Sequence, residues 1–270
     1  MSQSQTPRHQ PLIDRFNERR MGAAQRWRTA AHHAGYLLAY LRPGMDLLDV
    51  GCGPGTITWG LAEHVAPGRT VGLDLRVRPR REDVATLGPA PDFVVGSVYS
   101  LPFDDDRFDA AHAHALFQHL DRPLDALREL RRVLRPGAVI GLADWDRAGT
   151  LLHPAPPELT RSLEWLSELR RMDGGDPTAG RRLAELMQQA GFDEPAMHVV
   201  ADGFGSGPAA ARTAEGFART LEEPAVVARL VDGGVAAADE LQDLPARWRA
   251  WGGQPGAIFV ALWFCAVAFR

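Results

Sequence analysis

Residues 47–58 read LLDVGCGPGTIT, and the fold can be predicted outward from this stretch. An apolar run leads into a glycine-rich turn, and apolar residues at helical spacing follow the turn. This order predicts a buried strand, a tight loop and a helix, the first half of a strand–helix–strand unit. Gly51 and Gly53 lack a Cβ, so the backbone there can take positive φ and a ligand can lie against it. Asp49 falls where a parallel strand ends, at the edge where open α/β sheets bind ligands.

The spacing of the glycines bears on the kind of ligand. A nicotinamide dinucleotide normally requires G-x-G-x-x-G, whose third glycine packs the helix against the strand. Here the spacing is G-x-G-x-G, and Thr56 stands where that third glycine is expected. Asp49, just before the turn, suits a ligand with an ammonium group better than one with a phosphate. An NAD-dependent oxidoreductase therefore remains as the less favoured alternative.

Two stretches of the sequence resemble motifs of a known enzyme family. Residues 49–55 resemble the first motif of the class I S-adenosylmethionine-dependent methyltransferases, and the stretch from 108 to 137, FDAAHAHALFQHL…RVLRPG, is similar to their fourth strand and following helix. The resemblance is strong over residues 43–147 and is of the ubiquinone/menaquinone methyltransferase kind. It implies a doubly wound, mostly parallel, seven-stranded Rossmann-like α/β sheet with helical lid insertions. It also implies methyl transfer from S-adenosyl-L-methionine to a small molecule, such as one of secondary metabolism.

The resemblance also implies contacts to the cofactor. Residues 69–76 predict a short strand that ends at Asp74, and an acidic residue roughly twenty residues beyond the glycine turn can hydrogen-bond both ribose hydroxyls. NAD shares that ribose, so Asp74 alone does not choose between the two cofactors. Many relatives read G-D-A after the third strand, where this chain has Gly96, Ser97 and Val98. The expected cofactor contacts are Asp49, Gly51, Cys52, Gly53, Asp74, Leu75, Ser97, Val98, His114 and Ala115.

Candidate catalytic residues follow the fourth and fifth predicted strands, residues 108–114 and 138–143. His114 occupies the position that abuts the reacting sulfur in relatives, and His119 matches a common second histidine. Asp144 comes directly after the fifth strand, at the same sheet edge. A base is needed only if the acceptor carries a proton at neutral pH, and the candidates in order are His114, Asp144 and His119.

A substrate site is expected next to these residues. Trp145 and Asp146 complete the predicted end of the fifth strand, and an aromatic with carboxylates at a ligand-binding edge suits a substrate pocket. Trp27, in a predicted N-terminal helix, is a third candidate for substrate contact. No cluster predicts a metal site, and His32 with His33 is interpreted as a solvated pair on that helix.

Length and composition limit which other classes of protein this chain can belong to. The chain has 270 residues, of which 45% are hydrophobic, enough for one large domain or a domain with a cap. A net charge of -4 gives no basic field for nucleic acid, and the apolar run of residues 257–269 is too short to span a bilayer. With no signal-peptide pattern, the chain is expected to be cytoplasmic, away from nucleic acid and membranes, as a monomer or homodimer.

The predicted organisation has two parts. Residues 1–44 form an N-terminal helical cap, and residues 45–270 form a methyltransferase domain. Helical insertions at about 147–178 and 205–252 are expected to enter near the ligand edge and to form a lid. Two alternatives to a small-molecule enzyme stay open besides the oxidoreductase. One is a non-catalytic S-adenosylmethionine-binding protein, and the other is a nucleic-acid or protein methyltransferase, which the lack of a basic stripe disfavours.

Overall fold

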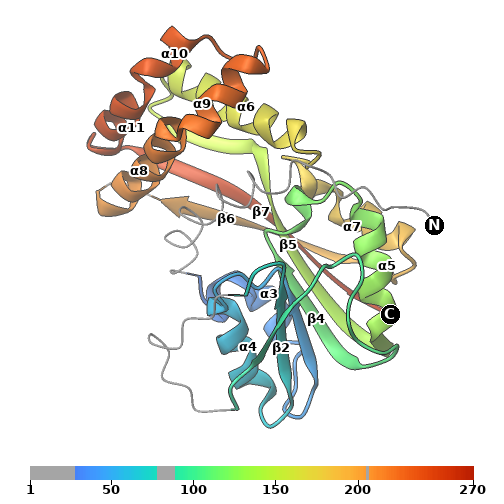
Figure 1. Ribbon diagram of the computed structural model, residues 1–270. Coiled ribbons are helices and arrows are strands. Elements are labelled where there is room, and N and C mark those ends of the chain that lie inside the picture. The colour runs from blue at the N-terminus through green and yellow to red at the C-terminus, as the bar shows by residue number, and fades with distance from the viewer. Residues whose placement is uncertain (1–27, 78–88, 205–206) are drawn as a thin grey trace, which may run out of the picture.

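The computed structural model describes residues 28–77, 89–204 and 207–270 (Figure 1). A seven-stranded sheet runs through it in the order β3-β2-β1-β4-β5-β7-β6. Strands β1 to β5 pair in parallel, while β7 is antiparallel to both of its neighbours. The predicted doubly wound sheet is confirmed. Its strands are β1 (Leu47–Val50), β2 (Thr70–Asp74), β3 (Asp92–Val95), β4 (Phe108–His114), β5 (Leu134–His153), β6 (Ala196–Phe204) and β7 (Ile258–Phe269).

Helices cover both faces of the sheet. On one face lie α2 (Ala30–His33), α3 (Gly35–Leu38) and α4 (Thr56–Val65), and on the other α5 (Pro123–Val133) and α7 (Ala179–Gln189). A short 3-10 turn, η1 (Phe117–His119), follows β4. The predicted N-terminal helix is described only from residue 28, and Trp27 lies outside the described residues.

A separate group of helices gathers beyond the end of the sheet, at the far ends of β5 and β7 (Figure 1). Trp248 is fully buried there, with its ring stacked on Phe217 at 4.5 Å and its indole N–H bonded to the Ser162 hydroxyl at 3.0 Å. We call this group the helical lid. It contains α6 (Pro157–Met172), α8 (Pro208–Glu222), α9 (Pro224–Asp232), α10 (Ala238–Gln242) and α11 (Leu244–Gly252). None of the helices in the described parts of the chain has the length and apolar character needed to cross a bilayer.

The fifth strand differs most from its prediction. The sequence predicted residues 138–143, with a turn at Asp144, whereas β5 runs from Leu134 to His153. Residues 139–146 and 151–153 pair with β7, and the register shifts between the two segments. The expectation that Asp144, Trp145 and Asp146 end the strand is wrong, because β7 supplies backbone partners well beyond the predicted end. The first insertion therefore begins as a strand that carries the chain out to the helical lid.

Candidate functional site

The glycine turn after β1 is held against the end of β2. The backbone N–H groups of Gly51 and Cys52 donate to the Leu73 carbonyl at 2.7 and 3.2 Å. Gly55 has φ +81°, and a Cβ there would come within 2.7 Å of the Phe93 ring. Only glycine avoids both the backbone strain and that clash. The turn therefore packs closely against β2 and Phe93 on one side. Its other side is available to a ligand.

Asp74 stands at the end of β2 beside this turn. Its carboxylate accepts hydrogen bonds from the backbone N–H of Gly53 at 2.9 Å and of Arg76 at 3.1 Å. Burial raises the pKa of Asp74, against the effect of these hydrogen bonds. The carboxylate is thus fixed in place, and each of its oxygens keeps lone pairs for further donors. The neighbouring Leu75 is 55% exposed.

Asp49 is engaged inside the protein. Its carboxylate accepts hydrogen bonds from the Thr58 hydroxyl at 2.5 Å and lies 2.8 Å from Nδ1 of His112. Asp49 and His112 are both buried, and they are register partners on β1 and β4. The interpretation that Asp49 binds a ligand's ammonium group overlooked these two partners. Thr58 and His112 lie 9 and 63 residues from Asp49 in the chain, and no local pattern predicts that they contact it.

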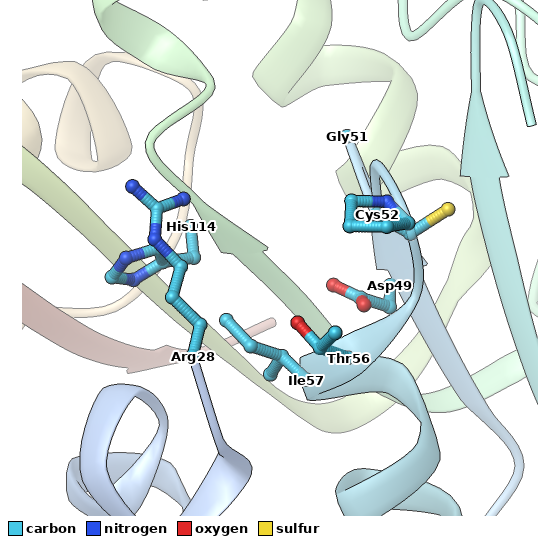
Figure 2. Close-up of a pocket in the computed structure, with 8 residues that line it drawn as sticks. Arg28, Asp49, Gly51, Cys52, Thr56, Ile57 and His114 are labelled. Carbon is cyan, nitrogen blue, oxygen red and sulfur yellow. The ribbon is translucent and has the colours of Figure 1, made fainter. Parts of the chain in front are cut away.

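A pocket opens between the glycine turn and the chain before α2 (Figure 2). The guanidinium of Arg28 lies beside the imidazole of His114, across the pocket from Asp49 and Cys52. Burial lowers the pKa of Arg28 to about 10, although Asp144 and Asp202 act in the opposite direction. Among the described residues, no carboxylate forms an ion pair with Arg28. The pocket is lined by Arg28, Asp49, Gly51, Cys52, Pro54, Thr56, Ile57 and His114.

His114 has an environment unlike that of the other candidate bases. Its ring stacks on Trp263 at 4.4 Å and meets the ring of His33 edge-on at 5.3 Å. Neither ring nitrogen has a hydrogen-bond partner in the described part of the chain. Burial, and next the positive charge of Arg28, hold the pKa of His114 well below its ordinary value. The imidazole is therefore neutral at pH 7, and one of its ring nitrogens can accept a hydrogen bond.

The alternation of side chains along β5 separates residues that the sequence placed together. His114 on β4 is the register partner of Ala143, so it shares a face with Ala143 and Trp145, while Asp144 and Asp146 lie on the opposite face. Asp146 is buried and forms an ion pair with Arg181 of α7. The structure thus does not bring the three residues that follow the predicted fifth strand into one pocket with His114.

Asp144 and His119 both lie at η1, of which His119 is the last residue. The Asp144 carboxylate accepts hydrogen bonds from the backbone N–H groups of Gln118 at 3.0 Å and Trp145 at 2.9 Å. Burial raises the pKa of Asp144 to about 6. The ring of His119 lies 2.7 Å from the Arg170 guanidinium, and burial lowers the pKa of His119 well below its usual range.

The remaining expected contacts are placed as follows. The Ser97 hydroxyl accepts a hydrogen bond from the backbone N–H of Tyr99 at 3.2 Å. Val98 is buried and packs in the core, which leaves only its backbone for a ligand. Ala115 has φ +57° and bonds to the Ala143 carbonyl, so it makes the sharp exit from β4. None of these three borders the pocket of Figure 2.

The structure also brings together a group that the sequence did not suggest. His32, His33 and Asp202 each offer a ligand atom, and these atoms lie within 4.8 Å of one another. Asp202 is on β6, 170 residues from His32 in the chain, and its carboxylate lies 3.4 Å from Nε2 of His32. His32 is thus not simply a solvated residue, because it pairs with a carboxylate across the fold.

Comparison with known proteins points to one family. Residues 48–142 match the family described as "Methyltransferase domain". This region runs from β1 to β5 and includes the glycine turn, Asp74 and His114. It therefore carries the residues of the candidate cofactor site apart from Arg28.

Curated relatives match a longer stretch. An uncharacterized methyltransferase of Schizosaccharomyces pombe is 34% identical over 167 residues, which cover 58% of this chain and 60% of that protein. A 2-phytyl-1,4-naphtoquinone methyltransferase of Nostoc punctiforme is 31% identical over 156 residues, which cover 55% of this chain and 64% of that protein. The match thus spans less than two thirds of either relative. Among solved structures, YcgJ of Bacillus subtilis superposes with a TM-score of 0.56 at 18% identity, over 88% of this chain and 98% of that one, which shows a shared fold.

Proposed function

We propose that this chain, which carries a methyltransferase domain of the class I S-adenosylmethionine-dependent type, transfers a methyl group from S-adenosyl-L-methionine to a small-molecule acceptor. The observation that carries the proposal is the glycine turn bonded to the end of β2, where Gly53 donates to Asp74, beside a pocket that holds Arg28 and His114. This arrangement offers backbone, a carboxylate, a guanidinium and an imidazole to one ligand.

The residues present fit the cofactor. Asp74 would accept hydrogen bonds from the ribose hydroxyls, and the backbone of the glycine turn would lie against the amino-acid part. Arg28, a partly buried guanidinium with no carboxylate ion-paired to it in the described chain, suits the methionine carboxylate. When bound, S-adenosyl-L-methionine supplies a methyl group on a positively charged sulfur, which is already a good leaving group.

The protein's own contribution is to position the acceptor, exclude water and remove a proton. His114 lies in the pocket wall as a neutral imidazole, so a ring nitrogen can accept a proton from an acceptor hydroxyl, amine or acidic carbon. The helical lid and the aromatic residues beside His114 would shield the reacting atoms from water. Alignment of the acceptor atom with the methyl carbon supplies the rest of the rate enhancement.

An acceptor with an apolar or aromatic body is favoured. His114, Trp263 and Trp145 lie on one face of the sheet, and the Trp263 ring is nearly parallel to each of the other two rings. Such a surface suits a flat or hydrophobic molecule. The Nostoc relative, by its name, acts on a phytyl-naphthoquinone, which agrees with an acceptor of this kind.

The test is transfer of a labelled methyl group. We expect the protein to move radiolabel from S-adenosyl-L-methionine to at least one member of a panel of phenols, naphthols, quinols and aromatic amines, with one S-adenosylhomocysteine formed per methyl transferred. Binding of the cofactor without transfer to any of them would favour the non-catalytic alternative. Hydride transfer with NAD in place of methyl transfer would favour the oxidoreductase.

Arg28 gives a prediction that is specific to the amino-acid part of the cofactor. Arg28→Gln is expected to weaken S-adenosylhomocysteine binding by about ten- to a hundredfold, because a charge-assisted hydrogen bond is lost. A cofactor analogue without the carboxylate, decarboxylated S-adenosylmethionine, should bind wild type and variant equally. Calorimetry of both ligands on both proteins measures this.

The matched control for that prediction is Arg42→Gln, which removes an arginine from the same end of the chain but outside the pocket. It should leave both affinities unchanged. Equal losses for the two ligands in Arg28→Gln would show that Arg28 does not hold the carboxylate.

A further inference from the structure

A set of unpaired hydrogen-bond donors lies beyond the cofactor pocket, on the same face of the sheet as His114. Trp145 and Trp263 are register partners on β5 and β7, with ring centres 6.3 Å apart and an interplanar angle of 23°. The indole N–H of each is buried and has no partner among the described residues. Buried donors are normally satisfied, so these two indicate a ligand that offers acceptors.

One arginine contacts this aromatic surface, and a second lies on α6, whose Leu166 and Leu169 belong to the same hydrophobic cluster as Trp263. The guanidinium of Arg147, two residues after Trp145 on β5, stands over the Trp145 ring at 4.2 Å. Arg170, in the last turn of α6, has its guanidinium 2.7 Å from Nδ1 of His119. The Nε atoms of both arginines are buried without a partner, and neither arginine forms an ion pair with a carboxylate within residues 28–77, 89–204 and 207–270.

Other arginines close to these two are neutralised. Arg229 pairs with Asp173 at the end of α6, and Arg181 pairs with Asp146 on the opposite face of β5. Arg147 and Arg170 instead lie close enough to repel one another. Burial first, and then the charge of Arg170, lower the pKa of Arg147 to about 9.

The charges in this region do not balance. Asp144 is a buried carboxylate that attracts both Arg147 and Arg170, but its hydrogen bonds go to backbone N–H groups. Asp173 acts on Arg170 more strongly, but it already pairs with Arg229. The three guanidiniums and two carboxylates together leave one positive charge in a partly buried place. A buried charge without a partner is unfavourable, and one monoanion would remove the imbalance.

We propose that Arg147 and Arg170 bind a carboxylate group of the methyl acceptor, whose aromatic or apolar body lies against Trp145 and Trp263. This inference rests on the proposed function, because it assigns the acceptor of the same site. A carboxylate matches the planar donor fork of an arginine, and it can also accept hydrogen bonds from the indole N–H groups. The acceptor is therefore a carboxylic acid with an aromatic or hydrophobic skeleton.

The experiment compares an acid with its uncharged amide. The protein, saturated with S-adenosylhomocysteine, is titrated in a calorimeter with 4-hydroxybenzoate and with 4-hydroxybenzamide. We expect the benzoate to bind wild type at least about tenfold more tightly than the amide. Arg147→Gln and Arg170→Gln should each weaken benzoate binding by about ten- to a hundredfold and leave amide binding nearly unchanged.

Arg171→Gln is the matched control. Arg171 is the next residue on α6 but is exposed and paired with Glu168, so its loss should leave both affinities at wild-type values. Thermal unfolding without ligand checks the fold. Arg147→Gln should be at least as stable as wild type, because it removes a charge without a paired carboxylate. Arg170→Gln also loses the contact with His119, and it should remain folded with a loss of no more than about 1.5–3 kcal/mol.

The outcomes separate this inference from the proposed function. Equal binding of benzoate and benzamide, no binding of the benzoate, or the same loss in Arg171→Gln would overturn the carboxylate site. A failure to bind S-adenosylhomocysteine would instead contradict the proposed function. Repeating the titrations without S-adenosylhomocysteine still measures the preference for the anion in that case.

Discussion

Replacing His114 by alanine is expected to lower kcat by about 10²–10⁴-fold, the usual contribution of a positioned general base. The reason is that His114 is a neutral imidazole in the pocket wall, with both ring nitrogens unpartnered in the described structure. Affinity for S-adenosylhomocysteine should change little, because the glycine turn, Asp74 and Arg28 remain. Steady-state kinetics on an accepted substrate, with calorimetry on the same variant, gives both quantities.

Two checks accompany that variant. His64→Ala removes an exposed histidine at the end of α4 and should leave kcat unchanged. Protonation of His114 should cause no loss of rate as the pH falls through about 6.5, since burial keeps His114 unprotonated below its ordinary pKa. A normal kcat with weakened cofactor binding in His114→Ala would mean that His114 packs against the cofactor and is not a base.

Replacing His112 by leucine is expected to lower the free energy of unfolding by about 1.5–3 kcal/mol, the usual contribution of a hydrogen bond to a carboxylate. His112 and Asp49 are both buried, and Nδ1 of His112 lies 2.8 Å from the Asp49 carboxylate. Without His112, that carboxylate keeps only the Thr58 hydroxyl among its side-chain partners. Urea unfolding at pH 7 measures the loss as a lower midpoint at unchanged slope.

The double variant Asp49→Asn, His112→Leu tests the cause of this loss. With the buried charge also removed, part of the stability should return, which a double-mutant cycle reads as a coupling energy. His64→Leu, on the exposed side of α4, should change stability by less than about 0.5 kcal/mol. A loss in His112→Leu below about 1 kcal/mol would show that the pair with Asp49 is unimportant for stability.

Much of the fold could be predicted because its signals are local. The apolar run, the glycines and the helical spacing of residues 47–58 lie within one short stretch, and they gave β1, the turn and α4. The length of β5 could not be read in this way. Residues 147–153 look like the start of an insertion, but the strand continues because β7, more than a hundred residues later, pairs with residues 151–153.

Which residues share the candidate site depends on the register between the strands. The sequence placed His114, Asp144 and Asp146 at one sheet edge, but only the pairing of His114 with Ala143 reveals that both aspartates lie on the other face. Contacts between residues far apart in the chain also could not be predicted from local patterns. Arg170 reaches His119 from a helix of the lid, and Asp202 reaches His32 from β6. The sequence had singled out Trp27, next to Arg28, as a candidate for substrate contact, but no local pattern showed that the Arg28 guanidinium would enter the pocket.

The most direct test of the central claim is the calorimetric affinity of wild type and Asp74→Ala for S-adenosylhomocysteine and NAD. We expect wild type to bind S-adenosylhomocysteine and not NAD. Asp74→Ala should bind S-adenosylhomocysteine about ten- to a hundredfold more weakly, because the ribose loses its charged acceptor. Asp92→Ala, which removes an exposed carboxylate from the neighbouring strand, should bind as wild type does. Binding of NAD alone would contradict the claim, and an unchanged affinity in Asp74→Ala would remove Asp74 from the cofactor site.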